Sequence, residues 1–167
     1  MAMTVLAETE TRFRADPSAA RSASTVTATL ANGRARLSAG PFNWDADLPV
    51  ALGGENLAPS PTAYLLGALA GCGVAFIHDT LAPQFDVTID DVTAVARCTA
   101  DARGLLGLDG VAADIADIEL DIRVASPSPG DRVEAMLAAW GERCPIYLAL
   151  LKPRSIVLSS ARIVETG

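Results

Sequence analysis

The sequence predicts an α+β domain in which antiparallel β-meanders wrap around long helices. Strand-like segments flank the Asn32-Gly33 pair, a dipeptide that favours a tight β-hairpin. A long apolar segment, 61–81, follows the hairpin, and two more strand-like segments come before the next helix. Adjacent antiparallel strands need no crossover helix, so this order argues against a doubly wound parallel sheet.

The first 24 residues differ from the rest of the chain. They are polar, rich in Ala and Ser, and have no sustained apolar period. We expect residues 1–24 to be a mobile arm that orders only against a partner subunit. The same segment has no apolar stretch typical of an export signal, so we expect a cytoplasmic protein. The remaining residues, 25–167, are long enough for one core and too short for two.

The hairpin occupies residues 25–38. Polar and apolar residues alternate in Thr25-Val-Thr-Ala-Thr-Leu, and alternation resumes after Gly33. A third strand is expected within 41–49. The glycines and prolines of 53–61 then form a loop that leads to the first helix.

The first helix is predicted over 61–81, with Ser60 or Thr62 as its cap and Pro83 as its stop. Its many Gly and Ala residues allow another backbone to approach closely, so the helix should be central. Its most apolar part, 63–77, is shorter than the roughly 20 residues that a bilayer requires. We therefore interpret it as a buried helix of a soluble protein.

A second meander follows, with strands predicted over 87–99 and 113–125 and a glycine-rich turn between them. The Ser/Pro cluster 126–131 offers caps for another helix. A short helix opens at Cys144-Pro145, and 155–164 is predicted as a final strand. The apolar stripe of the preceding helix consists of Val133, Met136, Leu137 and Trp140.

The composition and the motifs of the chain exclude several classes of partner and cofactor. The chain has 13 Lys and Arg against 20 Asp and Glu, a net charge of −7, which repels phosphate backbones and anionic lipids. We expect neither nucleic acid nor a membrane as a partner. Aromatic residues make up 5% of the chain, and no phosphate loop, dinucleotide fingerprint or Gly-x-Ser-x-Gly elbow is present. No cofactor is expected.

Cys144 is a candidate nucleophile because Pro145 favours the first position of a helix, so helix amides would point at the Cys144 sulfur. Arg143 beside it would add positive charge. The alternative is that Cys144 is a small buried cap, and the sequence leaves both readings open.

Cys72 lies in the middle of the apolar helix, where burial raises a thiol's pKa. By itself it reads as a core residue. It becomes reactive only if a cation from elsewhere meets it, and Arg34 and Arg36 on the hairpin are the first candidates. Cys98 has no helix terminus beside it and reads as structural or simply exposed.

His78 is the single histidine and lies six residues from Cys72, well round the helix from it. A Cys/His nucleophile pair within this helix is therefore not expected. A zinc site of His78 with the three cysteines would lack the closely spaced cysteine pairs typical of such sites. We expect no metal.

Two segments resemble the signatures of the OsmC/Ohr family, the osmotically inducible and organic hydroperoxide resistance proteins. They are Pro59-Ser-Pro-Thr-Ala-Tyr-Leu-Leu-Gly-Ala-Leu-Ala-Gly-Cys72 and Arg143-Cys-Pro-Ile-Tyr-Leu-Ala-Leu-Leu-Lys-Pro153. Their cysteines are about seventy residues apart, and the resemblance extends from Thr25 to the C-terminus.

The resemblance implies an OsmC-like fold of meanders around two long helices and an intertwined homodimer with active sites at the interface. It implies that the Cys72 thiolate attacks an organic hydroperoxide and becomes a sulfenic acid, which Cys144 resolves as a disulfide. A thiol or dithiol reductant would then restore both cysteines. The implied role is a peroxidase in oxidative stress defence.

The sequence departs from that pattern at two places. The peroxidases of the family carry Glu ten residues before the first Cys, where this chain has Thr62, and Glu55 is the nearest substitute. Arg34 aligns only loosely with the family's activating arginine, and the nearby segment 42–45 ends in Asp45. A second hypothesis therefore stands beside the peroxidase: a non-catalytic member that binds a small hydrophobic or thiol-bearing ligand at the dimer interface.

Overall fold

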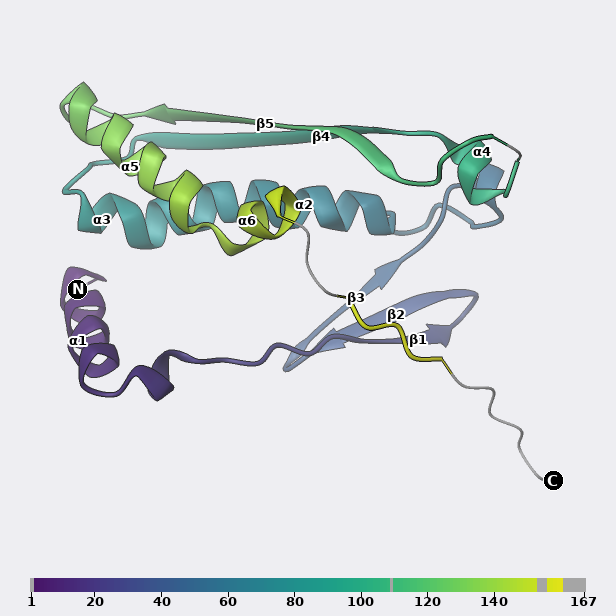
Figure 1. The fold of residues 1–167 in the computed structure, drawn as a ribbon, viewed down its shortest axis with the longest axis horizontal. Helices are drawn as coiled ribbons and strands as arrows, with labels where there is room; N and C mark the ends of the chain where they lie inside the picture. Colours follow the sequence, from purple (N-terminus) through teal and green to yellow (C-terminus); the bar gives the residue numbers. More distant parts are fainter. Residues whose placement is uncertain (1, 109, 153–155, 161–167) are drawn as a thin grey trace.

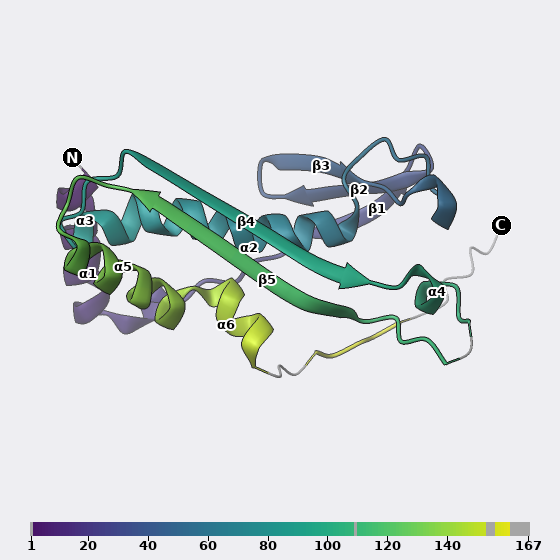
Figure 2. The ribbon, with the colours of Figure 1, turned by 90° about the horizontal axis from the view of Figure 1, so that it is seen from above.

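A long helix lies at the centre of the molecule, and a two-stranded antiparallel sheet covers one of its sides (Figure 1). The computed structural model describes residues 2–108, 110–152 and 156–160. Helices α5 (Gly130–Arg143) and α6 (Pro145–Leu151) run beside the central helix, and a separate three-stranded sheet lies away from them (Figure 2).

From the first hairpin to α6 the elements follow one another in the order that the sequence predicts, and several helices that the sequence does not predict are added. They are α1 (Ala2–Ala15), η1 (Pro17–Ala20), β1 (Thr27–Ala31), β2 (Arg34–Ala39), β3 (Phe42–Ala46), η2 (Val50–Leu52), α2 (Pro61–Phe76), η3 (Ile77–Leu81), α3 (Ala82–Gln84), β4 (Asp91–Ala100), α4 (Ala102–Leu105), β5 (Ile115–Ala125), α5 (Gly130–Arg143) and α6 (Pro145–Leu151).

The first meander confirms the predicted hairpin. Strands β1 and β2 are antiparallel, and Ala31 faces Arg34 across the turn. Asn32 and Gly33 both have positive φ, 51° and 77°, which is the backbone that an Asn-Gly turn favours. Strand β3 pairs with β2 and confirms the third strand.

The segment 1–24 contains a helix, α1, that the sequence pattern does not predict. The Gln84 amide donates a hydrogen bond of 3.1 Å to the Glu10 carboxylate, which joins α1 to the end of α3 in the same chain. A helix with no clear apolar stripe depends on such tertiary contacts, which its sequence does not show.

Helix α2 begins as expected and ends later than expected. The Ser60 hydroxyl accepts a hydrogen bond from the Ala63 amide, and Pro61 takes the first position. The helical segment continues through Pro83 to Gln84 because η3 is a π-helical turn, in which the Ala82 amide bonds to the Ile77 carbonyl. Proline has no amide hydrogen, and its ring crowds the carbonyl four residues back; the wider turn accommodates both constraints.

The continuous helical segment Pro61–Gln84 has 24 residues, so by length and composition it is long and apolar enough to cross a membrane. The apolar stretch that the sequence predicts, 63–77, is too short for this. Within this single chain 28% of its most apolar stretch is buried. The buried side faces β4, where Gly73 lies so close that an added Cβ would stand 3.0 Å from the Cβ of Ala94.

The second meander, β4 and β5, confirms the two predicted strands. They form an antiparallel pair that runs from Asp91 opposite Ala125 to Ala100 opposite Ile115, with an irregularity at Cys98. The connection contains the short helix α4 where only a turn was expected.

Helix α5 buries Met136 and Trp140, as its apolar stripe predicts. The serines expected to cap α5 form hydrogen bonds elsewhere. Pro129 precedes the helix without a side-chain cap, while Ser126 and Ser128 hydrogen-bond to the backbone of Thr88. The Ser/Pro cluster therefore binds the segment before β4 instead of capping the helix.

The final strand expected over 155–164 is not formed in its described part. Residues 156–160 have no regular structure, and Ile156, Val157 and Leu158 are 89–90% exposed. Residue 155 and residues 161–164 lie outside the described part of the chain. A strand needs a neighbouring strand for its hydrogen bonds, and none is paired with residues 156–160.

Replacing Gly73 with Val tests the close approach of α2 to β4. The added side chain overpacks the contact with Ala94, and we expect a loss of about 1–3 kcal/mol of unfolding free energy, measured by thermal or urea unfolding. Gly141→Ala is the matched control, because an added Cβ there meets no atom within 4 Å. A Gly73→Val variant as stable as that control would contradict the proposed packing.

Candidate active site

The structure brings together the two cysteines that the sequence singles out. The Sγ atoms of Cys72 and Cys144 are 2.7 Å apart, although 72 residues separate them in sequence. Both are free thiols, and Cys144 is completely buried while Cys72 is half-buried. The pair lies where the middle of α2 meets the corner between α5 and α6.

The break between α5 and α6 determines the position of Cys144. Its amide donates a hydrogen bond of 2.8 Å to the Trp140 carbonyl and ends α5, and its extended ψ of 114° turns the chain into α6. Pro145 starts α6, as predicted, and favours this break because the residue before a proline avoids helical backbone. The Cys144 thiol is thereby directed into the corner.

Cys72 is held from the side of α5. The Trp140 indole Nε1–H donates a hydrogen bond of 3.1 Å to the Cys72 carbonyl. The indole itself is 5% exposed and packs against the Tyr147 ring of α6, with centroids 5.3 Å apart. Trp140 therefore joins the three helices that form the thiol pair.

The surroundings of the pair keep Cys72 protonated. Burial, together with the hydrogen bond and charge of Cys144, raises the pKa of Cys72 to about 12, and the Ile146 backbone amide opposes this rise. No guanidinium acts on the sulfur in the described chain. In this single chain the thiolate is the disfavoured form at neutral pH.

The cations expected near Cys72 lie elsewhere. Arg36 pairs with Asp45 across the first meander at 3.0 Å. Arg34 acts on buried Asp47, whose pKa is lowered by a hydrogen bond from the Leu57 amide, by further backbone amides and by the Arg34 charge. Both arginine side chains therefore interact with carboxylates of the first meander and the loop that follows it.

Arg143 points away from its neighbour Cys144. Its guanidinium lies 6.0 Å from the centroid of the Phe85 ring and hydrogen-bonds to the Gln84 side chain. Its positive charge therefore lies at the end of α3. The sequence could not show in which direction the Arg143 side chain points.

The positions tied to the missing family carboxylate are also remote from the sulfurs. Thr62 stands in the first turn of α2, ten residues or about 15 Å of helix before Cys72. Glu55 belongs to a loop closed by its own amide bonding to Asp47. Neither has an interaction with Cys72.

The remaining candidates stay separate from the pair. His78 is exposed and bonds to Asp79 at 2.7 Å, consistent with its expected place well round the helix. Cys98 lies on β4 at the irregularity opposite β5. Across the described residues, no three His, Cys, Asp or Glu side chains gather closely enough to hold a metal ion.

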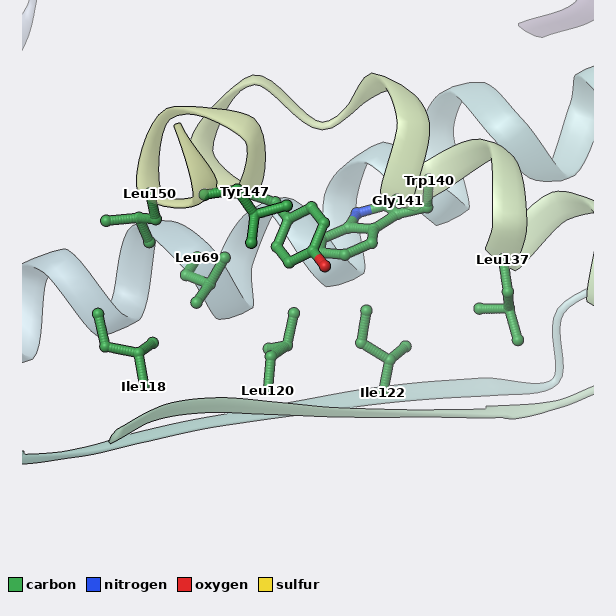
Figure 3. Close-up of a pocket in the computed structure, with 10 residues that line it drawn as sticks. Leu69, Ile118, Leu120, Ile122, Leu137, Trp140, Gly141, Tyr147 and Leu150 are labelled. Carbon is green, nitrogen blue, oxygen red and sulfur yellow. The ribbon is translucent and has the colours of Figure 1, made fainter. Parts of the chain in front are cut away.

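A cavity of about 620 Å³, which the sequence does not reveal, is lined in part by Trp140, the residue that hydrogen-bonds to the Cys72 carbonyl (Figure 3). One wall is β5, where Ile118, Leu120 and Ile122 point inward at every second residue, and Trp140 and Tyr147 close the opposite side. The alternation along β5 is visible in the sequence, but the opposing helices are not.

The family model of OsmC-like proteins matches residues 53–159, a range that contains both cysteines. The chain belongs to the OsmC-like protein family. No curated protein matches the sequence.

Solved structures of OsmC-like proteins share the fold. The chain is 21% identical to an OsmC-like protein from Mycoplasma pneumoniae, with a TM-score of 0.64 and coverage of 78% of this chain and 88% of that one. For an organic hydroperoxide resistance protein OsmC from Legionella pneumophila the identity is 18%, the TM-score 0.56 and the coverage 77% and 89%. These likenesses confirm the mixed α+β fold with antiparallel sheets.

The raised pKa of Cys72 predicts a pH dependence of stability. The folded thiol keeps its proton while the unfolded thiol loses it near the ordinary value of 9.0, so the stabilisation present below that pH is lost as pH rises towards about 12. For the single chain in reductant, the unfolding free energy of the wild type should fall more steeply between pH 8 and pH 10.5 than that of Cys72→Ser.

Thermal unfolding across this pH range measures the difference. Cys98→Ser is the control, since that residue lies apart from the pair, and it should keep the steep wild-type slope. Parallel curves for the wild type and Cys72→Ser would show that the folded single chain does not hold the proton.

Proposed function

We propose that the protein is a cytoplasmic thiol peroxidase that reduces organic hydroperoxides with Cys72 and Cys144. The observation that carries the proposal is the contact of two free thiols, one half-buried and one buried, at 2.7 Å. Membership of the OsmC-like family supports it. The relative from Legionella pneumophila is described as a hydroperoxide resistance protein.

In the proposed cycle the Cys72 thiolate attacks one peroxide oxygen and the O–O bond breaks. The organic fragment leaves as an alcohol after taking a proton, and Cys72 becomes a sulfenic acid. The Cys144 sulfur then attacks the Cys72 sulfur, and the hydroxyl leaves as water. Two thiols are oxidised to one disulfide, and an external thiol or dithiol reduces that disulfide through a mixed disulfide.

The cycle needs positive charge near Cys72 because burial favours the neutral thiol. We propose that a second copy of the chain supplies it from the hairpin that carries Arg34 and Arg36. The single chain leaves apolar surfaces uncovered, which supports a homodimer. They include the first meander, where Leu30 is 84% and Phe42 70% exposed.

The face of α2 opposite β4 supports the same assembly. An added Cβ at Gly67 or Gly71 meets no atom within 4 Å, so this side of the core helix is flat and open in one chain. Such a face suits close packing against another backbone. A dimer would also cover the apolar residues 156–158.

A second candidate function is ligand binding without peroxide chemistry. The high pKa of Cys72 and the absence of a guanidinium at its sulfur in the described chain favour it. The neighbouring cavity offers a binding site. The two candidates predict different fates for the thiols.

Peroxide turnover distinguishes them. Fully reduced protein mixed with cumene hydroperoxide should consume one peroxide and lose two thiols per chain, as measured by peroxide assay and thiol titration. Cys72→Ser should lose this reaction, and Cys144→Ser should stop at a sulfenic acid that dimedone traps. Cys98→Ser is the control and should react like the wild type. Unchanged thiols and unconsumed peroxide would leave the binding function.

The proposed homodimer has its own test. Sedimentation should give a mass of two 17.3 kDa chains. The double substitution Leu30→Asp and Phe42→Asp places charges on the exposed meander and should shift the protein to single chains, whereas Val5→Asp, on α1, should not. A wild type that sediments as one chain at micromolar concentration would contradict the assembly.

A further inference from the structure

A second cleft, of about 400 Å³, lies between α1 and the place where α3 meets the end of α5. Figure 1 shows α1 at the same end of the molecule as α3. The family model begins at residue 53, so α1 lies outside the range that it matches, whereas α3 and α5 lie within it. The cleft is therefore built partly by a segment that the family model does not include.

Two groups of opposite charge line this cleft, the Glu10 carboxylate on α1 and the Arg143 guanidinium at the end of α5. The Gln84 side chain stands between them. Its amide nitrogen donates a hydrogen bond of 3.1 Å to Glu10, and its amide oxygen accepts one of 3.5 Å from Arg143. The carboxylate and the guanidinium are thus separated by one amide group and its two hydrogen bonds.

Both charged groups can bind more than they do in this structure. Glu10 lies 3.7 Å from Arg14, whose side chain is 83% exposed, and such surface pairs are weak. Arg143 has no carboxylate within ion-pair distance among the described residues, and its hydrogen bond to Gln84 is long. A guanidinium has five N–H donors, so most donors of Arg143 are available to a ligand.

The rest of the lining is apolar. Leu6 and Ala7 come from α1, and Pro83 and Phe85 face them from the other side. Phe85 is half-buried and packs against the hydrophobic core, so its ring is a fixed surface of the cleft. The volume of about 400 Å³ lies within the range of roughly 300–1,000 Å³ that ligand sites occupy. A molecule in this cleft meets one negative group, one positive group and an apolar surface.

We propose that this cleft binds a free α-amino acid with an apolar side chain. The ligand carboxylate accepts hydrogen bonds from Arg143, the ligand ammonium donates to Glu10, and the ligand side chain packs on the apolar lining. An α-amino acid carries both charges on one carbon, which suits two opposite charges held a short distance apart. A simple anion would face Glu10, and a simple cation would face Arg143, so the cleft disfavours both. Neither cysteine of the thiol pair lines this cleft.

Isothermal titration calorimetry of the full chain with L-leucine tests the proposal, and we expect saturable binding. Two probes each lack one charge of leucine: 4-methylpentanoate has no ammonium, and 3-methylbutylamine has no carboxylate. Each should bind at least about tenfold more weakly, because it loses charge-assisted hydrogen bonds and leaves one group of the cleft facing a like charge. Glycine should also bind more weakly than leucine, since it has no side chain to pack on the apolar lining.

Variants of the two charged residues locate the site. Glu10→Gln removes the charge but keeps an oxygen that can accept the Gln84 hydrogen bond, so α1 should stay in place. It should weaken leucine binding by about five- to tenfold without weakening the binding of 4-methylpentanoate, a difference that mere loss of structure would not give. Arg143→Gln should weaken the binding of both leucine and 4-methylpentanoate.

The matched controls are Glu8→Gln, an exposed carboxylate of α1 outside the lining, and Arg123→Gln, an arginine that pairs with Asp121 on β5. Both should bind leucine like the wild type, and circular dichroism checks that every variant is folded.

Three outcomes would overturn the proposal: no saturable binding of leucine at millimolar concentration, equal affinity for leucine and either probe with a single charge, or unchanged leucine binding by Glu10→Gln and Arg143→Gln. The titration contains no peroxide, and its result is therefore independent of the proposed peroxidase.

Discussion

The arrangement of the site depends on the hydrogen bond that the Trp140 indole donates to the Cys72 carbonyl. It connects the middle of α2 to the last turns of α5, and Cys144 follows four residues after Trp140. Because Trp140 also packs on Tyr147, the same side chain fixes α6 and forms a wall of the cavity. The thiol contact and the cavity are therefore two results of one packing arrangement.

The same packing disfavours the thiolate form of Cys72. The burial that brings the sulfurs together also raises the pKa of Cys72. Two arginines that the sequence suggests for the sulfurs contact other groups in the single chain, Arg36 with Asp45 and Arg143 near Phe85. Peroxide chemistry at Cys72 therefore requires charge from outside the single chain. The uncovered meander and the open face of α2 support the proposal that a second copy supplies this charge.

Local structure was predictable wherever a few adjacent residues decide the backbone. Asn32-Gly33 set the hairpin turn, Ser60 and Pro61 set the start of α2, and Cys144-Pro145 set the break before α6. The errors arose where distant groups decide. The π-helical turn carries α2 past Pro83, the cluster serines bond to Thr88 instead of α5, and residues 156–160 have no strand beside them.

The sequence by itself determined the family, the first hairpin, the central helix, the second meander and the two cysteines of interest, because these follow from short-range propensities and from motifs read directly along the chain. Only the tertiary structure decided that the two sulfurs meet at 2.7 Å, that Arg143 turns away from them, and that an apolar cavity opens along Trp140. These features join residues far apart in the chain. Their geometry comes from side-chain packing between helices, which no local sequence pattern specifies.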